Sequence, residues 1–142
     1  MKAKLIAAGF LVFLTLRPSW AEPVCATRLD PVLEAIRSSS PLNLDGATCQ
    51  QSRELSGATR QTCYWTFAYR APEAEAAFEG WSNALLACYG SENAQLSDQP
   101  VNHPDSYILH RFKAETAEIS LSLKDKAGLG QTLVFLQLAS KP

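Results

Sequence analysis

Helical spacing of apolar residues predicts two helices in the chain. In residues 27–37 the apolar positions recur every three to four residues, and Asp30-Pro31 suits a first helical turn. A longer helix is predicted over residues 72–90, because Pro72 is followed by acidic residues and Gly90 supplies a stop. One face of this helix carries an apolar stripe that can pack against a sheet: Phe78, Trp81, Leu85 and Cys88.

Alternation of polar and apolar residues predicts the strands. Residues 63–70 are rich in aromatic side chains and alternate, which is typical of a central strand. Residues 47–53 are expected to pair with residues 60–70 in a hairpin around Ser56-Gly57. Three more strands, joined by short turns into a meander, are predicted at residues 107–113, 116–124 and 131–138.

The resulting element order, α-β-β-α-β-β-β, predicts a single α+β domain. We expect an antiparallel sheet of about five strands with two helices on one face, and the polar face of the middle strand towards water. The polar stretch 91–105, which contains Pro100 and Pro104, shows neither period and is predicted to be a long loop. Loops of this length tend to be functional or flexible, so this one is the first place to look for a site.

The first 21 residues have the layout of a cleavable secretory signal. Lys2 and Lys4 form a basic start, residues 5–16 are uncharged and mostly apolar, and Ser19-Trp20-Ala21 places small residues at alternate positions. A membrane-spanning helix needs about 20 apolar residues, and this run is interrupted well before that length. We therefore predict a signal peptide over 1–21 and a domain over 22–142; the alternative is a buried N-terminal helix.

Charge and hydropathy restrict the compartment and the partners. Three of the 13 basic residues leave with the signal while all 14 acidic residues stay, so the remaining chain carries 10 basic groups against 14 acidic ones, a net charge of −4. Without a basic stripe to neutralise phosphates, nucleic-acid binding is not expected. No second apolar run approaches spanning length, so membrane integration after cleavage is not expected either. The bacterial periplasm is the predicted location.

The four cysteines, Cys25, Cys49, Cys63 and Cys88, predict two disulfides in an oxidising compartment. They are too far apart in sequence for a zinc finger or a redox motif. Two pairings fit the predicted elements. A hairpin would join Cys49 to Cys63 and leave Cys25 for Cys88. Alternatively, the strand and the helix after it have similar lengths, which would return Cys88 to Cys63 and leave Cys25 for Cys49.

Candidate chemistry is confined to the two histidines and one carboxylate. His103 and Asp105 lie in the long loop, and His110 lies in the next strand, so the three could bind zinc or copper or supply a general base. Their spacing does not require them to converge. A turn at residues 102–105 and a half-buried structural histidine on the face of Ile108 and Phe112 explain them more simply. No cofactor is predicted.

A protein interface is the other candidate site. Tyr64 and Tyr69 lie on opposite faces of one strand, so at least one of them is expected near the surface. An exposed tyrosine beside Arg70 suits a protein interface, where Tyr, Trp and Arg are enriched. The loop adds three further candidate contact residues: Asn102, His103 and Asp105.

The sequence contains no nucleophile elbow, phosphate-binding glycine loop or metalloprotease motif. This favours a small exported, disulfide-stabilised binding protein of the cell envelope, of the inhibitor, immunity or accessory type, with another protein as its partner. The alternative is a periplasmic metal-binding protein or enzyme that uses His103, Asp105 and His110. A purely structural envelope component is a third hypothesis.

Overall fold

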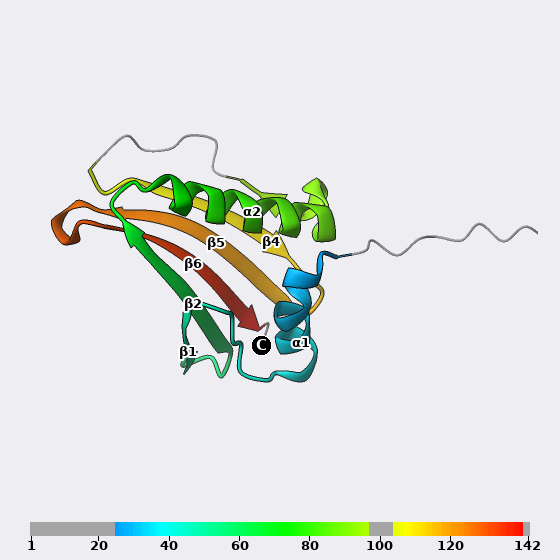
Figure 1. Cartoon of the computed structure of the whole chain (residues 1–142). Helices are drawn as coiled ribbons and strands as arrows, with labels where there is room; N and C mark the ends of the chain where they lie inside the picture. The colour runs from blue at the N-terminus through cyan, green and yellow to red at the C-terminus, as the bar shows by residue number, and fades with distance from the viewer. Residues whose placement is uncertain (1–24, 97–103, 141–142) are drawn as a thin grey trace, which may run out of the picture.

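A computed structural model describes residues 25–96 and 104–140 of the chain. The predicted signal peptide and its cleavage site lie outside the described residues. The described chain is an α+β domain in which a long, curved antiparallel sheet carries two helices (Figure 1). Among the described residues there is no helix long and apolar enough to cross a membrane.

The first half of the domain is a short helix followed by a hairpin. A single 3-10 turn, η1 (Thr27–Leu29), leads into α1 (Asp30–Ser38), which has Pro31 in its first turn. The hairpin consists of β1 (Thr48–Arg53) and β2 (Thr59–Ala68). Its turn is closed by hydrogen bonds between Glu54 and Ala58 and between Gly57 and Glu54, and the positive φ of 88° at Gly57 favours glycine there.

The second half is a long helix followed by the rest of the sheet. Helix α2 (Pro72–Tyr89) leads through η2 (Ser91–Asn93) into the two-residue strand β3 (Ala94–Gln95). Strands β4 (Tyr107–Lys113), β5 (Ala117–Lys126) and β6 (Gln131–Ser140) form the meander, with η3 (Ala127–Leu129) in the last turn. All neighbours in the sheet are antiparallel, and the strand order is β1-β2-β6-β5-β4-β3.

The predicted fold class is confirmed, with one strand more than the five expected. The additional strand, β3, is too short to show an alternating pattern, and it lies inside the stretch 91–105 that was predicted to be a loop. Residues 91–95 therefore form a 3-10 turn and an edge strand. Residues 97–103 of that stretch lie outside the described residues.

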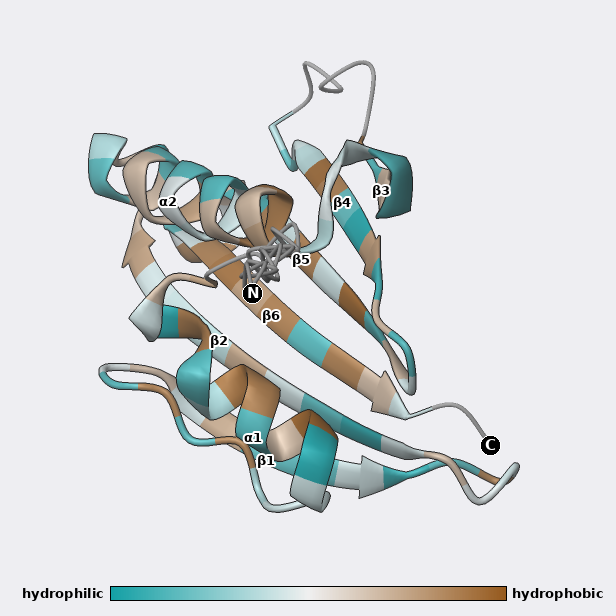
Figure 2. Ribbon diagram, turned by 90° about the vertical axis from the view of Figure 1, so that its right-hand side faces the viewer, coloured by the Kyte–Doolittle hydropathy of each residue, from teal (hydrophilic) through white to brown (hydrophobic). Residues whose placement is uncertain are grey.

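Both helices lie on the same face of the sheet, as Figure 2 shows. Alternate residues of the long strands point into the core between the sheet and the helices. Four of them are fully buried: Ile119, Leu121, Val134 and Leu136. From the helices, Val32 and Leu85 complete this core. The other face of the sheet carries the second half of each alternation, and the described helices do not cover it.

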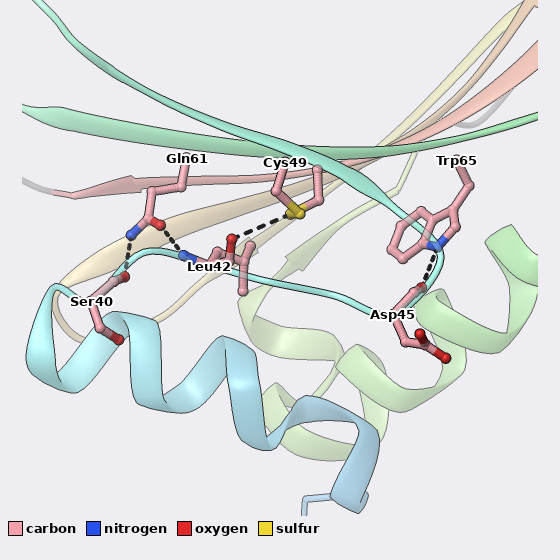
Figure 3. Close-up of a disulfide and its surroundings, with 7 residues drawn as sticks. Ser40, Leu42, Asp45, Cys49, Gln61 and Trp65 are labelled. Carbon is pink, nitrogen blue, oxygen red and sulfur yellow. Dashed lines mark hydrogen bonds between the residues drawn. A yellow bond between two sulfur atoms is a disulfide. The ribbon is translucent and has the colours of Figure 1, made fainter.

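The disulfides follow the first of the two pairings that the sequence allowed. Cys49 and Cys63 are directly opposite each other in the β1–β2 ladder, and Cys25 joins the end of α2 at Cys88. The loop before β1 packs beside the hairpin disulfide (Figure 3). There the Gln61 side chain accepts a hydrogen bond from the Leu42 amide and donates one to the Ser40 carbonyl, so a buried glutamine fixes the loop.

At the end of the sheet near the β5–β6 turn, a buried carboxylate connects several segments of the chain. Asp125, 5% exposed, accepts hydrogen bonds from the hydroxyls of Ser106 and Thr132, both at 2.6 Å, and from Arg70 Nε at 3.0 Å. Burial alone raises the pKa of Asp125, but these hydrogen bonds and the Arg70 charge outweigh it and hold the pKa below its ordinary value. One side chain therefore links the end of β2, the approach to β4 and the β5–β6 turn.

Loss of either disulfide should destabilise the domain, and loss of Cys25–Cys88 should cost more. The two bridges span 63 and 14 residues. Loop-closure entropy assigns them about 4 and about 3 kcal/mol respectively. Urea unfolding of the paired Cys→Ser variants tests this ranking, and a larger loss for the Cys49/Cys63 pair would contradict the entropic account.

Replacement of Asp125 by Asn should lower the free energy of unfolding by about 3 kcal/mol, because the hydrogen bonds that the charged carboxylate accepts from Arg70, Ser106 and Thr132 are weakened or lost. The folded pKa lies below the unfolded value, so this carboxylate stabilises the fold above the unfolded pKa, and the contribution is lost as the pH falls through the folded pKa. Urea unfolding from pH 7 to pH 2 should therefore show a shallower acid loss in Asp125→Asn than in the wild type. Equal acid slopes would contradict this assignment.

Candidate interaction site

The uncovered face of the sheet carries a cluster of aromatic rings around one lysine. The rings of Tyr64 on β2 and Phe135 on β6 lie 5.5 Å apart. The Lys124 ammonium on β5 is 4.9 Å from the Phe135 ring and 5.1 Å from the Tyr107 ring on β4. We call these four residues the aromatic–lysine cluster. It crosses four adjacent strands.

Strand register produces the cluster. Tyr64 is directly opposite Phe135, and one step along the sheet Leu133, Lys124 and Tyr107 form the next cross-strand row. Side chains in adjacent rows on one face are within reach of each other, especially large ones. Tyr64, Phe135 and Lys124 are half-buried, and Tyr107 is 40% exposed. The cluster thus presents apolar ring surface and a positive charge to the outside.

Charge is divided between the two sides of the domain. By strand alternation, the uncovered sheet face carries one carboxylate, Glu118, and five cations: Arg60, Arg111, Lys113, Lys124 and Lys126. The helices on the other side carry one cation, Arg37 on α1, and five exposed carboxylates: Asp30, Glu34, Glu73, Glu75 and Glu79. Glu118 lies 3.9 Å from Arg111, and Arg60 is paired with Glu54 in the hairpin turn. An acidic chain therefore has a basic sheet face.

The structure does not bring Tyr64 and Arg70 together. Arg70 follows β2 with a positive φ of 54°, and its amide donates a hydrogen bond to Thr132 Oγ1. Its guanidinium then pairs with Asp125, which the strand alternation places on the helix side of the sheet. A non-glycine residue with positive φ breaks the alternation, so the strand pattern alone could not place this side chain. Tyr64 is in the aromatic–lysine cluster, whereas Arg70 holds the buried carboxylate.

Of the three candidate loop residues, the structure describes Asp105. Asp105 accepts a hydrogen bond from the Ala127 amide at 2.8 Å, which holds the loop end against the β5–β6 turn. Asn102 and His103 lie outside the described residues. His110 lies in β4, and the hydrogen bonds of the two side chains involve different partners, the Ala127 amide for Asp105 and the Ser82 hydroxyl for His110.

His110 instead faces α2. Its Nδ1 is 2.9 Å from the Ser82 hydroxyl, and its ring lies 4.8 Å from the Phe78 ring. Burial lowers the pKa of His110, because the charged imidazolium is less well solvated there. Ser82, 5% exposed, was missed at the sequence level. Ser82 lies one helical turn after Phe78, on the predicted apolar stripe of α2. That spacing is the one sequence feature that indicates a buried position for this serine.

A hollow of about 390 Å³ between the two helices contains Trp65 and Trp81, whose rings are 5.4 Å apart. The Arg28 guanidinium already lies 4.4 Å from the Trp81 ring centre. The guanidinium lies beside Gly80, where a Cβ would stand 2.8 Å from Arg28 Nη1. Trp81 is thus covered by its own chain.

Within the described ranges, no group of three or more His, Cys, Asp or Glu side chains is arranged to hold a metal ion. Comparison with protein-family models, curated proteins and solved structures finds no match to this chain. The candidate site is therefore assigned from its geometry.

The His110 environment predicts a titration midpoint below the ordinary value of about 6.5. Between the folded and the unfolded pKa of His110 the unfolded chain binds more protons, so stability is lost as the pH falls through this interval. An NMR titration of the His110 ring carbons checks this shift. A midpoint at or above 6.5 would show that water or a carboxylate solvates the ring.

Proposed function

We propose that this protein is an exported, disulfide-stabilised, non-enzymatic binding protein of the cell envelope, of the inhibitor, immunity or accessory type. Its binding surface is the uncovered sheet face, with the aromatic–lysine cluster at the centre. The observation that carries the proposal is a half-exposed group of side chains on a sheet face that no described helix covers: Tyr64 packs against Phe135, and Lys124 lies over Phe135 and Tyr107. Aromatic anchors within a polar rim are typical of interface centres.

The partner is an acidic protein surface with an apolar centre. Five cations and one carboxylate occupy the sheet face, so an approaching acidic surface is attracted to this side and repelled by the acidic helix side. Contact with the aromatic rings would then remove apolar area from water. Charge sets the orientation of the encounter and ring burial supplies the affinity.

Export is supported by the cysteines and by the sequence before them. Both disulfides are present and the described residues include no free cysteine, which suits an oxidising compartment. The predicted signal over residues 1–21 provides the route, and the periplasm is the proposed location. Rigidity matters for the function, because a surface fixed by two bridges loses little conformational freedom on binding.

Reversal of charge on the sheet face should weaken partner binding, whereas the same reversal elsewhere should not. The oxidised protein beginning at Glu22 is used to isolate a partner from envelope extract of its source, and the affinity for that purified partner is measured. Lys124→Glu/Lys126→Glu is expected to weaken binding by about tenfold or more, since close interfacial charge pairs contribute 1 kcal/mol or more each.

Arg37→Glu/Arg53→Glu is the matched control. It changes the net charge equally, but Arg37 is on α1 and Arg53 is on the β1 side that faces away from the cluster. Urea unfolding of both variants controls for stability. Equal weakening by both pairs would make the effect one of net charge, and unchanged binding in the sheet-face variant, or no saturable partner, would overturn the proposal.

A further inference from the structure

A groove between α2 and β4, on the opposite side of the sheet from the aromatic–lysine cluster, has the size of a small-molecule site. Its volume is about 550 Å³, within the range of ligand pockets. One stripe of α2 forms its helix wall, and β4 with Leu96 and Leu123 forms the rest. The stripe is formed by Glu75, Phe78, Glu79, Ser82, Asn83 and Leu86.

The inner part of the groove is apolar and well ordered by packing. Phe78 and Leu123 are 6% and 7% exposed, and Ile108 and Leu86 are half-buried beside them. Leu96, at the groove's outer part, is 41% exposed. An apolar group that entered the groove would cover this leucine and remove both surfaces from water.

Polar groups occur at two levels of the groove. At the inner level, Ser82 and His110 form a hydrogen bond between a nearly buried hydroxyl and an imidazole whose lowered pKa keeps it neutral at pH 7. At the outer level, Glu75 and Glu79 lie one turn apart on α2 and are exposed. None of the described residues that line the groove is a lysine or arginine.

These features together define the charge and shape of a ligand. We propose that the groove binds small apolar-bodied amines, with the apolar body between Phe78 and Leu96 and the ammonium group at Glu75 and Glu79. A neutral His110 adds no opposing charge. A carboxylate with the same apolar body would be repelled by both glutamates. The site is independent of the proposed protein interface, because it lies on the helix side of the sheet.

Three probes that share a phenyl ring and differ in charge test the site: 2-phenylethylamine, 2-phenylethanol and 3-phenylpropionate. Each is titrated into the ¹⁵N-labelled oxidised protein at pH 7 and low ionic strength. The amine should give saturable amide shifts at Ser82, Ile108 and His110, and its dissociation constant should be the lowest of the three. The carboxylate should give no saturable shift.

Glu75→Gln/Glu79→Gln removes the charge with little change of shape, and it should weaken amine binding by about tenfold because two solvent-facing ion pairs are lost. Glu34→Gln/Glu73→Gln is the matched control, since neither residue lines the groove, and it should bind the amine as the wild type does. Binding of all three probes with equal affinity would reduce the groove to a non-selective apolar surface. That result, shifts scattered away from the groove, or equal losses in both variants would overturn the proposal.

Discussion

Two helices cover one face of a six-stranded sheet, and this one-sided coverage determines the rest of the structure. The long strands alternate, so each of their inward side chains has an outward neighbour that the helices cannot reach. The inward set forms a dense core of aliphatic and aromatic side chains. The outward side chains lie on the face that no described helix covers, so they have to be compatible with contact with water.

Side chains on the uncovered face contact one another, and these contacts shield part of its apolar surface from water. Lys124 lies against two aromatic rings, and Gln137 accepts a hydrogen bond from Ser120 and donates one to Thr62. Long amphipathic side chains can shield apolar surface while they keep their charges in water. The same contacts hold Tyr64 and Phe135 in fixed positions. A face that is stable on its own is therefore also ordered before a partner arrives, which lowers the entropic cost of binding.

Local sequence patterns were sufficient for most of the fold and for little of the site. Alternation located the long strands, and the pairing of Cys49 with Cys63 was one of two arrangements that it allowed. It could not choose between them, because the choice depends on how α2 crosses the sheet. Ser82 and the aromatic–lysine cluster depend on contacts between distant segments. Arg70 was misplaced relative to Tyr64 because its positive φ interrupts the period on which the prediction relied.

The two disulfides are nested: the outer bridge joins the first and last cysteines, and the inner bridge joins the middle two. A chain that crosses a membrane N-terminus first would present Cys25 and Cys49 to an oxidant long before Cys88. Oxidation in the order of emergence would join those first two cysteines and leave a non-native partner for each of the others. If this chain is exported in that way, the native pattern forms either when Cys25 stays reduced until α2 has emerged or when thiol–disulfide exchange replaces the early bridge. Maturation in the envelope would then depend on the timing of oxidation.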